Sequence, residues 1–197
     1  SIYFERYTSD RAFTQDSLAE YARFPLFRTV GIDRSYYAPI PEPDLVTYAR
    51  QMPEDFVPIA KVWSEVTTPV FPKHPRYGER GGERNMRFLD PVLFDEQMGD
   101  PFTRTIGDAR IPFVLEVPPS SIELVPFTKA LDAFLGAQAG KHRFAVEIRN
   151  TSLLAPRYFD VLRAHGATHV FNYWERMPEL DVQYLSLIHI SEPTRPY

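Results

Sequence analysis

Polar side chains recur near the ends of short β-rich segments along this 197-residue chain. The set consists of Asp33, Lys61, Glu116, Glu147, Arg149 and Asn172. Carboxylates held beside Lys and Arg acquire opposed pKa shifts, which is the arrangement that general acid and base catalysis uses. If these segments bring the set together, the sequence predicts a charged site.

Each member of this set has an expected role. Glu147 is the candidate acid or base, and Lys61 with Arg149 would hold an anion. Asp33 and Glu116 are the candidate bases or cation ligands. An ion-pair network that only fills the centre of a barrel would have the same composition, so both interpretations stay open.

Ligand contacts and cofactors are less clearly marked. Asn172 and Tyr37 are expected to contact the ligand. The carboxylates of Asp33, Glu116 and Glu147 would suit a divalent cation such as Mg²⁺ or Mn²⁺, but no metal ligand is assigned. The chain has no cysteine, which excludes thiolate zinc sites and cysteine nucleophiles.

Short β-rich segments alternate with helical patterns, which is typical of βαβ units and a parallel sheet. Strands are expected over residues 27–33, 56–63, 111–117, 143–149 and 168–174. Pro58 would normally place the second of these strands at an edge or a bulge. Helices are expected over 16–23, from Pro43 to 52, from Asp90 onward with a break at Pro101, around 127–135, and from Pro156 to 165.

Side-chain alternation in segment 143–149 favours a barrel over an open sheet. A period of two places Glu147 and Arg149 on one face and Phe144, Val146 and Ile148 on the other. A strand covered by helices on both faces would be apolar on both. The expected fold is therefore an α/β protein with parallel strands, a TIM-type (β/α) barrel in which the polar residues lie at the carboxyl ends of the strands.

A long polar connection over residues 64–87 suggests a second kind of function. Its basic loop, residues 73–87, carries Arg76, Arg80 and Arg84, which could hold an anionic partner or nucleic acid. The net charge of -4 and the pI of about 5.7 provide no global attraction to nucleic acid or to an anionic membrane. Any such binding would have to be local.

Several motifs resemble one known family. They are Tyr21-Ala22, Asp33-Arg34-Ser35-Tyr36-Tyr37, Ala60-Lys61, Leu115-Glu116-Val117-Pro118-Pro119 and Ala145-Val146-Glu147-Ile148-Arg149-Asn150. In order and spacing they resemble the domain of unknown function 72, or YecE-like, family over about residues 2–174. The resemblance implies a TIM-type barrel whose activity is not established.

The chain departs from that family in ways that bear on the site and on completeness. Gly31 stands where the family commonly has Glu, and Glu116 stands where Gln is often found. The family's opening strand and its last two strands are not found, so we expect an incomplete barrel. Residues 185–197 resemble translated sequencing adapter, so the native domain is expected to span 1–184.

Three functions remain as hypotheses. The first is an enzyme-like barrel whose charged site acts on a small polar or phosphorylated ligand. The second, by analogy of fold alone, is metal-dependent phosphodiester hydrolysis of nucleic acid. The third is a non-catalytic protein that binds an anion or nucleic acid through the basic loop. Without a signal peptide or a membrane-length apolar run, a cytoplasmic protein is expected; the oligomeric state is not indicated.

Overall fold

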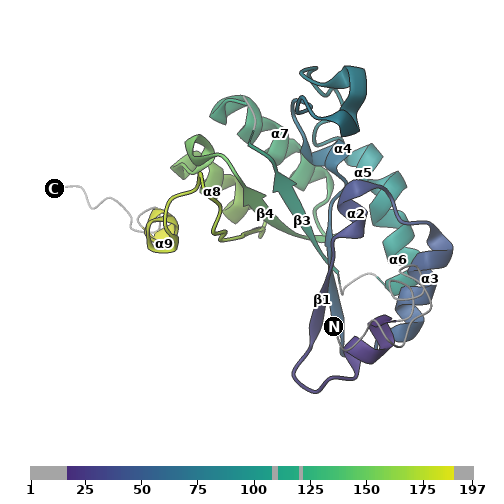
Figure 1. The fold of residues 1–197 in the computed structure, drawn as a ribbon. Coiled ribbons are helices and arrows are strands. Elements are labelled where there is room, and N and C mark those ends of the chain that lie inside the picture. Colours follow the sequence, from purple (N-terminus) through teal and green to yellow (C-terminus); the bar gives the residue numbers. More distant parts are fainter. Residues whose placement is uncertain (1–16, 108–110, 120–121, 189–197) are drawn as a thin grey trace.

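A computed structural model describes residues 17–107, 111–119 and 122–188 of the chain. Its centre is one parallel sheet with the strand order β1-β2-β3-β4-β5. The strands are β1 (Thr29–Ile32), β2 (Val57–Lys61), β3 (Pro112–Val117), β4 (Arg143–Ile148) and β5 (Thr168–His169). Because the spatial order follows the chain order, the strands form a continuous run of barrel wall (Figure 1).

Helices connect the strands and lie along one side of the sheet (Figure 1). Residues 17–22 are helical. The later α-helices are α2 (Arg34–Tyr37), α3 (Glu42–Gln51), α4 (Ser64–Thr67), α5 (Pro91–Phe94), α6 (Asp100–Ile106), α7 (Leu124–Ala137), α8 (Pro156–Ala164) and α9 (Leu180–Ile188). Shorter turns are the 3-10 helices η1 (Pro75–Arg80) and η3 (Thr151–Leu153) and the π-helical η2 (Asp95–Gly99).

Helix ends follow local sequence signals. The carboxylate of Asp90 accepts hydrogen bonds from the backbone N–H groups of Val92 and Leu93, and Pro91 follows at a position where no N–H is needed. The expected break at Pro101 is instead a π-helical turn, η2, directly before α6. A π turn releases the hydrogen bond that proline cannot make, so the helix continues.

One face of the sheet packs against the helices and forms the core. Its buried side chains include Ile32, Ala60, Val62, Phe113, Leu115, Val117, Phe144, Val146 and Ile148. The other face alternates with it and carries the polar residues, with half-buried Ile59, Val114 and Ala145 beneath them. The alternation expected from the sequence is therefore present in the sheet.

Pro58 lies in a central strand and not at an edge. The N–H of Val57 donates to the carbonyl of Arg28, the residue before β1, so the next residue along β2 faces β3. Pairing of β2 with β3 begins only at Ala60, which leaves no ladder bond for Pro58 to lose. The missing N–H is thus tolerated.

The structure differs from the sequence-based expectation in the length of the fifth strand and in the connection over residues 64–87. The fifth strand ends at His169, and residues 170–174 are not strand. The long connection 64–87 is structured: it contains α4, η1 and an antiparallel bridge between Val70 and Arg84. Of the predicted non-native tail, residues 185–188 continue α9, while 189–197 lie outside the described residues, as do residues 1–16.

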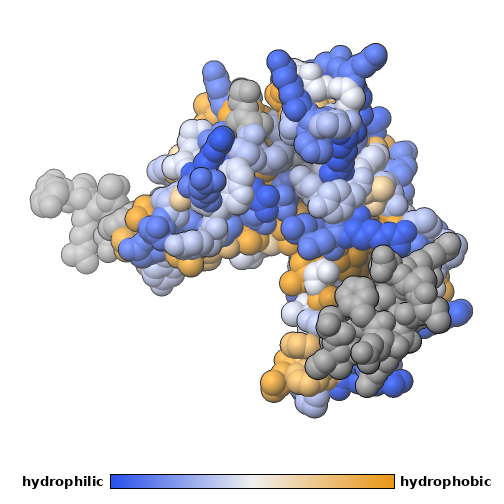
Figure 2. Space-filling view, viewed as in Figure 1, coloured by the Kyte–Doolittle hydropathy of each residue, from blue (hydrophilic) through white to orange (hydrophobic). Residues whose placement is uncertain are grey.

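Among residues 17–107, 111–119 and 122–188, none of the helices combines the length and apolar character that a bilayer span requires. Apolar side chains are nevertheless exposed at the turn before β1, where Phe24, Leu26 and Phe27 lie. Figure 2 shows hydrophobic residues gathered at that end of the molecule.

Candidate functional site

A small cavity of about 150 Å³ lies at the carboxyl ends of the strands. It is lined by Asp33, Tyr36, Tyr37, Lys61, Glu116 and Arg149. These residues come from the ends of β1, β2, β3 and β4 and from α2, which follows β1 directly. Six residues from five elements therefore converge, as expected for the mouth of a parallel barrel. We call this cavity with Glu147 the charged mouth.

Glu116 is the centre of the charged mouth. Its Oε2 lies 2.9 Å from Lys61 Nζ, and its Oε1 lies 2.9 Å from Arg149 Nη1. The side chain is only 6% exposed, so both oxygens are ion-paired away from bulk water. Glu116 is therefore held between two cations and fixes their positions.

Glu147 is the direct neighbour of Glu116 across the β3–β4 pair. Two carboxylates opposite one another in a sheet repel, and this pair is held by Arg149, whose Nε lies 2.8 Å from Glu147 Oε1. Arg149 therefore bridges both glutamates with one guanidinium group. This explains how two largely buried acids tolerate adjacent positions.

Lys61 connects the glutamates to β1. Its Nζ lies 3.4 Å from Asp33 Oδ1 as well as 2.9 Å from Glu116. Burial alone would lower the pKa of Lys61, but the hydrogen bond to Glu116 and the charges of Glu116, Asp33 and Glu147 outweigh it and raise that pKa. Lys61 is therefore a fixed cation at neutral pH.

Tyr36 also lines the cavity, although sequence reasoning selected only its neighbour Tyr37. Burial, followed by the negative charge of Glu116, raises the pKa of the Tyr36 phenol. The phenol therefore stays protonated and is a potential donor. Ser35 of α2 is fully buried. Its Oγ lies 2.7 Å from the Ile32 carbonyl oxygen and 2.6 Å from the Lys61 carbonyl oxygen, and these contacts hold α2 against the strand ends.

The basic loop reaches this site through Arg76. Its guanidinium donates to the carbonyl of Tyr37 at 3.1 Å and to Ser64 Oγ at 2.8 Å. It also lies over the ring of Tyr37, 4.8 Å from the centroid. Arg80 is likewise committed, since it pairs with Glu65 and lies 3.9 Å from the ring centroid of Phe71. Two of the three selected arginines thus attach the loop to the protein.

Asn172 lies outside the cavity lining. Its side-chain N–H donates to the Ile148 carbonyl at 3.0 Å, and its backbone carbonyl accepts from the side-chain amide of Gln183 in α9 at 2.9 Å. Gln183 is fully buried. These contacts attach the segment after β5 to β4 and to α9, and contact of Asn172 with a ligand stays a prediction.

Positively charged side chains separate the carboxylates that were expected to share a divalent metal ion. Lys61 stands between Asp33 and Glu116, and Arg149 between Glu116 and Glu147. Within the described residues, no group of three or more acidic or histidine side chains is arranged to hold a metal ion. This geometry does not favour the metal-dependent hydrolase.

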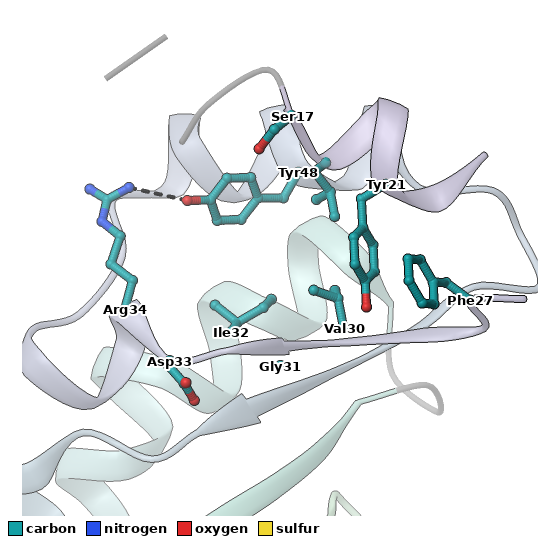
Figure 3. A pocket seen from close by; sticks show the side chains of 10 residues that line it. Ser17, Tyr21, Phe27, Val30, Gly31, Ile32, Asp33, Arg34 and Tyr48 are labelled. Atoms are coloured by element: carbon teal, nitrogen blue, oxygen red, sulfur yellow. Dashed lines mark hydrogen bonds between the residues drawn. The ribbon is translucent and has the colours of Figure 1, made fainter. Parts of the chain in front are cut away.

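A larger cavity of about 470 Å³ lies on the other side of β1 (Figure 3). Val30 and Ile32 point into it, together with Tyr21 and Phe27, whose rings stack at 4.3 Å. At its polar end Arg34 donates to the hydroxyl of Tyr48 at 3.3 Å. Asp33 lines both cavities, but its side chain points away from this one in Figure 3.

A parallel sheet in chain order, helices along one face and polar residues at the carboxyl ends define an incomplete TIM-type (β/α) barrel. The family model described as "Protein of unknown function DUF72" matches residues 5–187. The chain therefore belongs to the DUF72 family, as its motifs indicated.

Solved structures agree with this fold. A crystal structure of a DUF72 family protein from Enterococcus faecalis V583 is 17% identical, with a TM-score of 0.55, and covers 80% of this chain and 59% of that one. A second crystal structure of that protein gives 18% identity and a TM-score of 0.55 over 77% and 52% of the two chains. These likenesses show the fold alone.

A DUF72 family protein from Thermotoga maritima MSB8 is 22% identical, with a TM-score of 0.49 over 73% of this chain and 49% of that one. The chain spans 52–59% of the length of the Enterococcus faecalis structures that it matches. A search of curated proteins found no match.

Proposed function

We propose that the charged mouth is the active site of an enzyme that acts on a small polar ligand, phosphorylated ligands included. One observation supports this more than any other. Asp33, Lys61, Glu116 and Arg149, from four successive strands, surround one cavity with room for part of a ligand. Stability alone gives little reason for such a cluster, because desolvating ion pairs costs about as much as the pairing returns.

Glu147 is the proposed acid or base. Both oxygens of Glu116 are ion-paired, whereas in the described part of the chain only Oε1 of Glu147 takes part in an ion pair. Glu147 lies beside the lining residues Glu116 and Arg149 and not in the lining itself, and its second oxygen is the proposed point of proton exchange with a ligand. A positioned carboxylate in that role typically contributes 10²–10⁴-fold to a rate.

Asp33 is the proposed second carboxylate. Its side chain is 68% exposed and lies at 3.4 Å from Lys61, a longer contact than those of Glu116. Lys61 and Arg149 would hold the ligand by donating hydrogen bonds, and Glu116 would keep both cations in place. Tyr37, which is 63% exposed at the rim, would contact the ligand.

The test uses the complete protein and a thermal-shift screen against a broad set of polar and phosphorylated compounds. We expect Glu147→Gln and Lys61→Gln to abolish the stabilisation by compounds that raise the melting temperature of the unaltered protein, since binding to the native state is what stabilises it. Arg104→Gln is the matched control, because it removes an exposed ion pair with Glu42 between α6 and α3.

The proposal fails if both mouth substitutions raise the melting temperature while every ligand response stays as in the unaltered protein. Such a result would show that the cluster is an internal ion-pair network. The basic loop offers a weaker basis for function, because Arg76 and Arg80 are used to attach it.

A further inference from the structure

We propose that the ligand moiety bound in the charged mouth is a neutral ring bearing several hydroxyl groups, such as a sugar ring, and not a phosphate or other anion. This inference rests on the proposed function and narrows its ligand class. It follows from the charge balance of the cavity, its aromatic rim and its size.

The cavity lining is electrically balanced. Asp33 and Glu116 contribute two negative charges, and Lys61 and Arg149 contribute two positive ones. Glu147 adds a further negative charge beside Arg149. An anion would therefore meet carboxylates at short range, where repulsion in a partly desolvated site is strong.

The cations are also already engaged. Lys61 and Arg149 contact carboxylates at 2.8–2.9 Å, the range of charge-assisted hydrogen bonds. An anion would have to share Lys61 and Arg149 with those carboxylates, and it would be repelled by the negative charges of Glu116 and Glu147 at the same short range. A hydroxyl group can donate to a carboxylate and accept from Lys or Arg at the same time, so it fits between them.

Aromatic side chains form one side of the mouth. The rings of Tyr36 and Tyr37 meet edge to face, with centroids 5.5 Å apart. Arg76 packs over the Tyr37 ring and bonds to its backbone carbonyl, which holds that residue in place although 63% of it is exposed. A fixed, exposed ring offers an apolar surface for the C–H face of a sugar.

The cavity is small. Its volume of about 150 Å³ is below the roughly 300–1,000 Å³ of sites that enclose whole drug-sized ligands or cofactors. It therefore suits a single ring of a ligand, whether that ring is a free sugar or belongs to a nucleoside. Tyr36, with its protonated phenol beside Glu116, adds another donor and acceptor for hydroxyl groups.

Titration calorimetry on the complete protein tests this, with glucose, ribose, adenosine, inorganic phosphate and sulfate as probes. We expect saturable binding of at least one hydroxylated probe and none of phosphate or sulfate. Asp33→Asn and Tyr37→Ala should each weaken that binding about tenfold, the loss of roughly 1.4 kcal/mol. Binding of adenosine without ribose or glucose would assign the ring to a nucleoside.

Tyr173→Ala is the matched control, because Tyr173 is 82% exposed and lines a different cavity beyond β5. It should leave the affinity unchanged, and an equal loss there would overturn the assignment to the mouth. Saturable phosphate or sulfate binding that Arg149→Gln abolishes, with no hydroxylated probe bound, would overturn the ring inference and leave the proposed function standing. If none of the five probes binds, the ring inference fails, and the thermal-shift screen decides the proposed function separately.

Discussion

The two faces of the sheet are built from alternate residues of the same strands, yet they differ in almost every property. On the helix-covered face, Leu115 and Val146 are fully buried among apolar neighbours. On the opposite face, the next residues along, Glu116 and Glu147, form ion pairs at the mouth. One face is packed mainly with apolar side chains, whereas the other carries the charged groups of the proposed site.

This difference indicates how the molecule divides its tasks. Apolar burial contributes to stability in proportion to the area removed from water. Desolvated ion pairs contribute little net stability, since the cost of removing charges from water offsets their attraction. We therefore expect the helix-covered face to determine stability and the charged mouth to determine binding.

The largest effect is expected on the helix-covered face, from Phe94→Ala. Phe94 is fully buried, and its ring contacts those of Phe113, Phe134 and Phe144 with centroids 5.0–5.6 Å apart. Removing it leaves a cavity among three rings, so the free energy of unfolding should fall by ~3–5 kcal/mol. Urea denaturation measures this, with Phe24→Ala as the control because Phe24 is 49% exposed. A loss for Phe94→Ala no larger than that of the control would break the comparison.

A smaller effect is expected in the charged mouth, from Lys61→Met. The substitution leaves Glu116, 6% exposed, with Arg149 alone. Since Lys61 itself is 28% exposed, water moderates the loss, and we expect ~1–3 kcal/mol in the free energy of unfolding.

The double variant Lys61→Met with Glu116→Gln sharpens this result. It removes both the cation and the carboxylate that needs it, so it should recover part of the stability lost in the single variant. Urea denaturation measures the loss in free energy of unfolding for each variant. If the loss in the double variant exceeds the two single-variant losses added together, the pair does not behave as a compensated buried ion pair. The mouth would then contribute to stability more than the comparison allows.

The sequence predicted this division because period-two alternation and parallel strands constrain where side chains go. The positions of Asp33, Lys61, Glu116 and Arg149 follow from strand ends alone, and all four line one cavity. What alternation does not encode is the contribution of Arg76, which belongs to a long connection without periodicity and reaches the mouth through tertiary contacts.

Other features depended on local backbone geometry. Tyr36 lies in a four-residue helix, where no sequence pattern indicates which of two adjacent tyrosines faces the cavity, and both do. The π-helical turn before Pro101 relieves a proline that the sequence marks as a break. The fifth strand was overestimated because residues 170–174 have a β-like composition but lie beyond the paired part of the strand.

The smallest effect concerns His169, a buried histidine among the apolar residues of the helix-covered face. It is 6% exposed and lies 3.0 Å from the hydroxyl of the fully buried Tyr158, which also contacts the Val146 carbonyl at 3.2 Å. Burial lowers the pKa of His169, against a smaller opposing contribution from Gln183. The folded protein therefore binds the proton less well than the unfolded chain does.

The sign of the pH dependence follows from that lowered pKa. The contribution of neutral His169 to stability should be complete above the unfolded pKa of about 6.5 and should be lost as the pH falls from there through the folded value. Urea denaturation at pH 7.5 and pH 5.5 measures the loss, and His169→Gln should reduce it. His74→Gln is the control, because His74 is exposed and caps η1. Suppose that the unaltered protein and the two variants lose equal free energy of unfolding between pH 7.5 and pH 5.5. That result would mean that the buried histidine is tolerated in its charged form and that the helix-covered face is less strictly apolar than its packing indicates.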